Sequence, residues 1–276
     1  MRFASVVRDG KPAAVAIEDE LAIPLTDIVQ LGALTPTEVL SDPPLDRAAA
    51  FPLAQASLRP VIPAPGKVIC VGLNYRAHIE ETHREESDYP VLFTKFSSSL
   101  TGPFDPIPVP PESEAVDYEG ELAVVIGDRA RRVPAERALE YVGGYAVAND
   151  VTMRDYQYRT HQWLQGKAWE ASTPLGPALV TPDEVGDPST LTLRTTVNGQ
   201  PVQEASTELL IFPIPTLISV ISEFTALEPG DVILTGTPAG VGFRREPPLL
   251  MGDGDVAAVE IDRVGRIENR FTTERA

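Results

Sequence analysis

The chain has 276 residues, of which 40 are Asp or Glu and 23 are Lys or Arg, so its formal net charge at pH 7 is −17. This balance argues against nucleic-acid or anionic-membrane partners, because both require clustered cations. The longest apolar stretch, 209–221, is too short to span a bilayer. A single cysteine, Cys70, and an apparent lack of a signal segment lead us to expect a cytoplasmic protein.

The first 58 residues are predicted to form a small, strand-containing N-terminal domain. Apolar segments flank Asp9-Gly10, a pair typical of a tight hairpin turn. Residues 59–66 contain three prolines, which predicts a stiff linker. Residues 67–273 would then form one larger domain.

The larger domain is expected to be mixed α/β and rich in strands, with few short helices. The high count of 27 prolines and 20 glycines supports many short strands and turns. Residues 76–90 are strongly charged without a core-forming run, so we expect an exposed, mobile segment. The patterns predict strands at 67–73, 118–126, 145–148, 191–197, 231–235 and 256–262, and helices at 134–142 and 215–224.

Two carboxylates at the start of the 118–126 strand are the most informative feature. In an extended strand, Glu119 and Glu121 share one face, which continues as Ala123 and Val125. A solvated strand edge is the simplest interpretation. The opposite face is also apolar, however, so the strand is predicted to be buried on both sides. Two buried carboxylates repel each other unless a cation holds them, and all-oxygen ligands favour Mg²⁺ or Mn²⁺, with Ca²⁺ a further possibility.

A third ligand is expected at the end of another strand. The apolar strand at 145–148 leads directly into Asp150. Asp150 is either a metal ligand or part of a helix start, in which Asp150 caps the helix or Thr152 and Asp155 form a capping box. The residues alone leave both interpretations open.

Several motifs in order make the chain resemble the fumarylacetoacetate hydrolase family, which includes acylpyruvate hydrolases, oxaloacetate decarboxylases and hydroxy-dienedioate isomerases. The resemblance covers roughly residues 66–270. It implies a mixed β-sandwich roll with few helices, and a homodimer. The motifs that carry it are VICVGLNYRAHIEE, VLFTKFSSSLTGP, VDYEGELAVVIG, NDVTMRDYQ, QWLQGKAWEASTPLGP and PGDVILTGTPAGVG.

The resemblance also implies roles for individual residues. It favours Asp150 as a ligand beside Glu119 and Glu121, and it makes Lys167 an active-site lysine. Without it, Lys167 would be taken for a solvated surface lysine. The positions that match substrate-binding residues of the family are Arg154, Gln157 and Thr237.

His78 and Glu81 have the spacing that places two side chains on one side of a short helix. They resemble the His–Glu pair with which hydrolytic members activate water, and a histidine is suited to accept a proton near neutral pH. A surface histidine in a flexible loop is the alternative. The run Ala168-Trp169-Glu170 and Phe96 depart from common family sequences near the pocket, which leaves the substrate open.

The function expected from the resemblance is hydrolysis of a C–C bond in short 2,4-dioxo acids, such as acylpyruvates or fumarylpyruvate, through a metal-bound enolate. A small anionic 2-oxo acid is the expected partner. The first alternative keeps the metal site and is an isomerase of the 2-hydroxyhepta-2,4-diene-1,7-dioate type or an oxaloacetate decarboxylase. The second alternative is a non-catalytic metabolite-binding relative.

Overall fold

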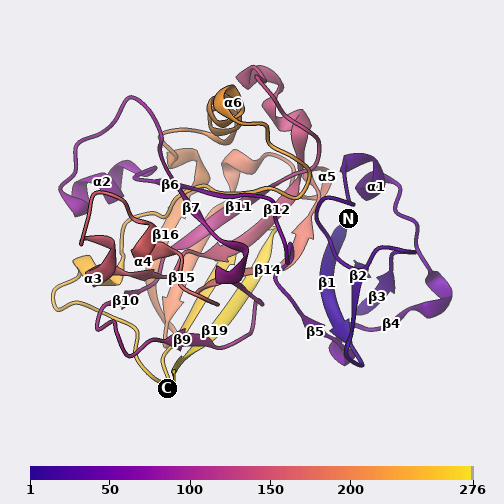
Figure 1. The fold of residues 1–276 in the computed structure, drawn as a ribbon, viewed down its shortest axis with the longest axis horizontal. Coiled ribbons are helices and arrows are strands. Elements are labelled where there is room, and N and C mark those ends of the chain that lie inside the picture. The colour runs from indigo at the N-terminus through magenta and orange to yellow at the C-terminus, as the bar shows by residue number, and fades with distance from the viewer. Residues whose placement is uncertain (275–276) are drawn as a thin grey trace.

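The computed structural model describes residues 1–274, which fold into three sheets with short helices around them (Figure 1). The largest sheet has 12 strands. Ten of them follow the order β4 (Phe51–Pro52), β3 (Leu21–Pro24), β2 (Lys11–Glu18), β1 (Arg2–Arg8), β14 (Thr173–Val180), β12 (Val142–Asn149), β11 (Gly120–Ile126), β17 (Val232–Leu234), β6 (Val68–Gly72) and β7 (Val91–Lys95). The other two are β5 (Ser57–Leu58) on β1 and β8 (Leu100–Thr101) on β14.

A five-stranded sheet and a two-stranded sheet complete the strand content. The first has the order β16 (Gln200–Ser206), β15 (Thr192–Val197), β18 (Val256–Ile261), β19 (Gly265–Thr273) and β9 (Ile107–Val109); the second pairs β10 (Val116–Asp117) with β13 (Thr152–Met153). The α-helices are α1 (Thr37–Ser41), α2 (Arg76–Thr82), α3 (Arg154–Gln157), α4 (Leu164–Lys167), α5 (Pro182–Val185) and α6 (Ile214–Phe224). Within residues 1–274, no helix has the length and apolarity needed to cross a membrane.

Strand β11 lies at the centre of the fold and is buried on both faces, as its sequence predicted. Leu122 and Val124 belong to a core that also contains residues of the five-stranded sheet and of α6. Ala123 and Val125 face the opposite way, into a second core. The mixed α/β, strand-rich class with few helices is therefore confirmed.

The N-terminal strands continue the large sheet, because β1 pairs with β14 and places Phe3 opposite Leu179. Phe3, Val61 and Ile62 are fully buried in the core that contains Ala123. Residues 1–58 therefore share a sheet and a core with the rest of the chain. Whether they form a separate domain up to the 59–66 linker stays a prediction.

Most predicted elements are present, with three corrections. Residues 134–142 contain a 3-10 helix at 135–141, which runs directly into β12. Strand β11 begins at Gly120, which leaves Glu119 just before it. The prediction that all of 76–90 is exposed is wrong for α2, which buries Ile79 and Thr82. Its buried face is too short and too polar to produce an apolar run; residues 83–89 are exposed.

Replacing Phe3 by alanine is expected to destabilise the whole chain by about 3–5 kcal/mol, because it leaves a cavity in a core that spans both parts of the large sheet. Urea denaturation checks this, with Val29→Ala as the control because Val29 is 55% exposed. A loss of less than about 1 kcal/mol, or separate unfolding of the N-terminal strands alone, would contradict the shared core.

Candidate active site

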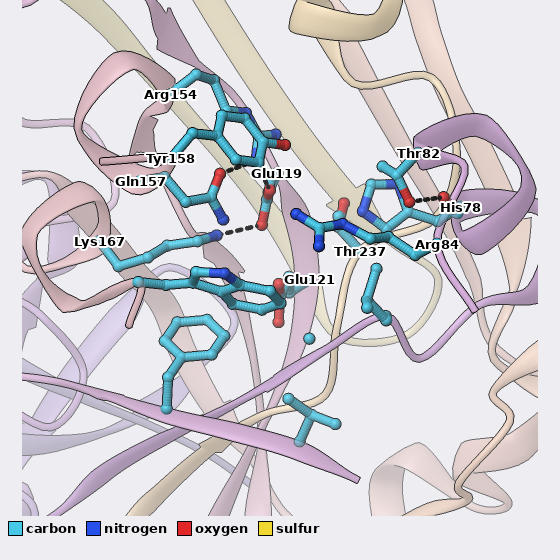
Figure 2. A pocket seen from close by; sticks show the side chains of 15 residues that line it. His78, Thr82, Arg84, Glu119, Glu121, Arg154, Gln157, Tyr158, Lys167 and Thr237 are labelled. Atoms are coloured by element: carbon cyan, nitrogen blue, oxygen red, sulfur yellow. Dashed lines mark hydrogen bonds and ion pairs between the residues drawn. The ribbon is translucent and has the colours of Figure 1, made fainter. Parts of the chain in front are cut away.

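A small cavity lies beside the N-terminal end of β11, between α2 on one side and α3 and α4 on the other (Figure 2). It is lined by seven of the nine residues selected from the sequence: His78, Glu119, Glu121, Arg154, Gln157, Lys167 and Thr237. The other two contact these residues from outside the lining. Glu81 pairs with His78, and Asp150 accepts a hydrogen bond from Lys167.

The antiparallel pairing of β11 with β12 brings the three acidic residues together. Gly120 lies opposite Asn149, so the residues that flank this pair, Glu119 and Asp150, become neighbours. The Asp150 N–H donates to the Glu119 carbonyl at 2.8 Å. Glu119, Glu121 and Asp150 are all buried, and one carboxylate oxygen from each lies within 4.8 Å of the others. We call these three residues the carboxylate triad.

The alternative interpretation of Asp150 as a helix cap does not match the structure. Helix α3 begins at Arg154 after Met153, and no side chain caps its N-terminus. The Asp150 carboxylate instead accepts hydrogen bonds from two ammonium groups, those of Lys95 at 2.5 Å and Lys167 at 2.7 Å.

Lys167 joins two members of the triad, since its Nζ also lies 2.6 Å from Glu119 Oε2. Burial alone would lower the pKa of Lys167, but the charges of Asp150 and Glu119 raise it above its ordinary value, so the amine stays protonated. Burial would raise the pKa of Glu119, but Lys167 and Arg154 lower it to about 2. Both groups are therefore charged at neutral pH.

Glu121 differs from the other two carboxylates in its partners. Its Oε2 accepts a hydrogen bond from the Gly236 N–H at 2.7 Å, and within residues 1–274 no Lys, Arg or His nitrogen lies within 4.0 Å of its oxygens. Burial, followed by the charges of Asp150 and Glu119, raises its pKa well above the ordinary value. Three buried carboxylates, one of them without a cationic partner, are suitable oxygen ligands for a divalent metal ion. Glu119, Glu121 and Asp150 would hold such an ion.

The turn that contains Gly236 admits only glycine. Gly236 has φ +102°, and a Cβ there would lie 2.8 Å from the Asn74 Cβ and 3.0 Å from the Val71 carbonyl. This backbone aims its N–H at Glu121 and places Thr237 next in the chain, at the cavity wall. The Thr237 hydroxyl accepts a hydrogen bond from Gln203 Nε2 at 2.9 Å.

Arg154 is fixed from several sides. Its Nη1 lies 2.7 Å from Glu119 Oε1 and 3.0 Å from Gln157 Oε1, while its Nε and Nη2 contact Asp117 Oδ2, both at 2.8 Å. Asp117 also accepts from the backbone N–H of Gly242, at 2.8 Å. It therefore ties Arg154 to the loop after β17.

His78 lies at the edge of the cavity opposite Lys167 (Figure 2) and pairs with Glu81. His78 Nδ1 lies 3.1 Å from Glu81 Oε2, and Glu81 Oε1 accepts from the Gly240 N–H at 2.9 Å. A carboxylate held at both oxygens orients the imidazole. The surface-histidine alternative does not match this placement, because His78 is buried.

Sequence reasoning missed several residues around the cavity. Lys95 and Asp117 gave no local signal, since their partners lie far along the chain. Phe93 and Trp163 form an edge-to-face pair with ring centroids 5.5 Å apart, and the Lys167 ammonium lies 5.2 Å from the Phe93 ring centroid. Two further lining residues, Arg84 and Tyr158, were also not selected.

Comparisons with known proteins identify the family of the chain. Residues 67–272 match the model of the fumarylacetoacetate (FAA) hydrolase C-terminal family. An oxaloacetate tautomerase of Rattus norvegicus mitochondria, Fahd2a, is 46% identical over 221 residues, which are 80% of this chain and 71% of the relative.

Two solved structures share the fold over essentially the full length of both chains. The 2-hydroxyhepta-2,4-diene-1,7-dioate isomerase from Mycobacterium marinum is 33% identical, with a TM-score of 0.85 and 100% of each chain covered. Maleylpyruvate hydrolase from Sphingobium sp. SYK-6, solved with manganese(II) and pyruvate, is 30% identical, with a TM-score of 0.79 and 100% of each chain covered. The chain is thus an enzyme that belongs to the fumarylacetoacetate hydrolase family, as its ordered motifs predicted.

Proposed function

We propose that this protein is a divalent-metal-dependent enzyme that interconverts the keto and enol forms of a small 2-oxo dicarboxylate such as oxaloacetate. The observation that carries the proposal is that His78, paired with Glu81, lines the same cavity as Glu119 and Glu121 of the carboxylate triad (Figure 2). The relative named oxaloacetate tautomerase, at 46% identity, supports this choice of reaction.

The reaction moves one proton between two atoms of the substrate, carbon 3 and the 2-oxo oxygen. His78, oriented by Glu81, would accept the proton from carbon 3 as the keto form becomes the enol. Negative charge then develops on the 2-oxo oxygen, and the Lys167 ammonium would donate a hydrogen bond to it. Transfer of that proton from the His78 imidazolium to the oxygen would complete the enol and restore the neutral imidazole, and the reverse sequence regenerates the keto form.

Arg154 and Thr237 would orient the substrate carboxylate, and Gln157, which lines the same wall, would add a hydrogen bond. The fixed contacts of Arg154 to Glu119 and Asp117 keep its guanidinium in place before substrate arrives. We propose Mg²⁺ or Mn²⁺ as the resident ion, on the oxygen-only donor set and on the manganese(II) of the Sphingobium relative. Such an ion supplies Lewis acidity toward the 2-oxo group.

Tautomerisation is tested by following the loss of the ultraviolet absorbance of enol-oxaloacetate in the presence of purified protein. We expect catalysis with Mg²⁺ or Mn²⁺, its loss after chelation with EDTA, and its return when either ion is added back. Full activity in EDTA would contradict the metal-dependent proposal. Ion-restored binding of oxalate without any turnover would instead favour a non-catalytic metabolite-binding protein.

A second candidate is hydrolysis of a C–C bond in short 2,4-dioxo acids, the reaction that the motifs led us to expect. The same His–Glu pair is suited to take a proton from water that attacks the 4-oxo carbon. The Sphingobium relative, named a maleylpyruvate hydrolase, supports this candidate. Release of pyruvate from acetylpyruvate or fumarylpyruvate, measured with a coupled dehydrogenase, distinguishes hydrolysis from tautomerisation because tautomerisation releases no fragment.

A further inference from the structure

Arg84 is a cation of the cavity that the proposed chemistry does not use. It lies in the exposed segment 83–89 after α2, and in Figure 2 its guanidinium points into the cavity from the His78 side. His83 ends α2 in the left-handed conformation, with φ 52°, which turns the chain back toward the cavity. The Arg84 N–H then donates to the Ile79 carbonyl at 3.2 Å, so the turn is tied to the helix.

The charge of Arg84 is not matched by a neighbouring acid, in contrast to the other lining cations. Lys167 and Arg154 each contact two buried carboxylates. Within residues 1–274, no carboxylate oxygen lies within 4.0 Å of a nitrogen of the Arg84 guanidinium. The segment is nevertheless held by a neighbouring ion pair, in which Arg76 Nη2 donates to Glu86 Oε1 at 3.1 Å.

A second arginine, Arg244, lies near the ring of Tyr158, as Arg84 does. The guanidinium carbons of Arg84 and Arg244 lie 6.0 and 5.8 Å from the centroid of the Tyr158 ring, which lines the cavity. Arg244 likewise has no carboxylate oxygen within 4.0 Å among residues 1–274, and its buried Nε has no hydrogen-bond partner there. Arg244 does not itself line the cavity, and its Nη2 lies 3.4 Å from the Tyr158 hydroxyl. The guanidinium of Arg84, which does line the cavity, together with the nearby charge of Arg244 therefore favours an anion at this end of the cavity.

We propose that Arg84, supported by the positive charge of Arg244, binds the second carboxylate of the substrate and makes the enzyme selective for 2-oxo dicarboxylates over 2-oxo monocarboxylates. This inference rests on the proposed function, in which Arg154 and Thr237 orient the first carboxylate. Arginine suits the task because its planar fork matches both oxygens of a carboxylate. A substrate that ends in a methyl group would leave this guanidinium unused.

The test compares two ligands of equal chain length, 2-oxoglutarate and 2-oxopentanoate, which differ in a terminal carboxylate and a terminal methyl group. Binding to the Mg²⁺-loaded protein is measured by calorimetry for the wild type, Arg84→Gln and Arg84→Lys. Arg47→Gln is the matched control: it removes the same charge from a residue whose side chain is 63% exposed and pairs with Glu18 outside the cavity. The KM for oxaloacetate is measured in parallel.

We expect Arg84→Gln to weaken 2-oxoglutarate binding and to raise the KM for oxaloacetate, each by about 10- to 100-fold, the usual range for one charge-assisted hydrogen-bonded contact. Binding of 2-oxopentanoate should change by less than about twofold. Arg84→Lys should recover part of the selectivity, and Arg47→Gln should match the wild type.

Equal losses for both ligands, or an unchanged preference in Arg84→Gln, would overturn the assignment. A wild type with no preference for 2-oxoglutarate would overturn it as well. The proposed function fails in a different way, by lack of turnover, and the binding comparison still decides the role of Arg84 in that case.

Discussion

Replacing Glu121 by glutamine is expected to remove metal binding while leaving the metal-free protein at least as stable as the wild type. Most substitutions of buried residues destabilise a protein, so the expected retention of stability is the more specific part of this prediction. It follows from the electrostatics of the carboxylate triad, in which Glu121 lacks a cationic partner within residues 1–274.

The folded chain raises the pKa of Glu121 above its unfolded value, through burial first and then through the charges of Asp150 and Glu119. A raised carboxyl pKa means that ionising this group costs folding free energy; the cost grows as the pH rises from the unfolded pKa to the folded pKa and stays constant above it. Glutamine has nearly the same shape, carries no charge, and keeps a carbonyl oxygen for the Gly236 N–H. The variant avoids the cost without losing that hydrogen bond.

The metal affinity of Glu121→Gln should fall even though its stability does not. An amide oxygen is a much weaker ligand for Mg²⁺ or Mn²⁺ than the carboxylate that it replaces. We expect a decrease in affinity of about 100-fold or more, which exceeds the usual 10- to 100-fold effect of removing a residue that only orients a ligand. Calorimetric titration with each ion measures it. Thermal unfolding adds a second readout, since added ion should raise the Tm of the wild type but not that of Glu121→Gln.

Glu140→Gln is the matched control, because Glu140 is 58% exposed and pairs with Arg137 on the surface. It should bind metal as the wild type does. Wild-type ion affinity in Glu121→Gln would contradict the assignment of Glu121 as a ligand. A metal-free Tm well below that of the wild type would contradict the electrostatic argument separately.

The sequence predicted burial best where the local pattern of apolar residues alone requires a segment to lie inside the fold. A strand that is apolar on both faces, 120–126, has to lie inside the fold, so the carboxylates at its start had to be buried as well. Asp150 could be interpreted as a ligand or a cap from its neighbours alone. The pairing of β11 with β12 resolves its position, and that pairing is a long-range contact that a single strand does not encode.

The residues that escaped prediction share one property: their partners are distant in sequence. Lys95 meets Asp150 across 55 positions, and Asp117 meets Arg154 across 37. A lysine at the end of an apolar strand and an aspartate before one look like ordinary surface charges until the fold joins them. The burial of one face of helix α2 was missed for a different reason, because that face includes His78 and Thr82, which hydropathy counts as polar.

Replacing His78 by asparagine is expected to lower kcat by about 100- to 10,000-fold, the range that a positioned general base contributes. Oxalate, a non-reacting ligand of the same site, should bind to the Mg²⁺-loaded variant within about twofold of the wild type. A lower kcat with unchanged oxalate affinity distinguishes a base, which acts in the transition state, from a residue that only shapes the cavity.

Glu81→Gln should lower kcat less than His78→Asn, because the amide can still hold the imidazole but carries no charge to stabilise the imidazolium that forms when His78 accepts the proton. His83→Asn is the control, five residues after His78: His83 is exposed, does not line the cavity, and has φ 52°, a conformation that asparagine accepts readily. It should retain wild-type turnover. Unchanged kcat in His78→Asn would remove the pair from the chemistry and leave the carboxylate triad with Lys167 as the whole of the catalytic site.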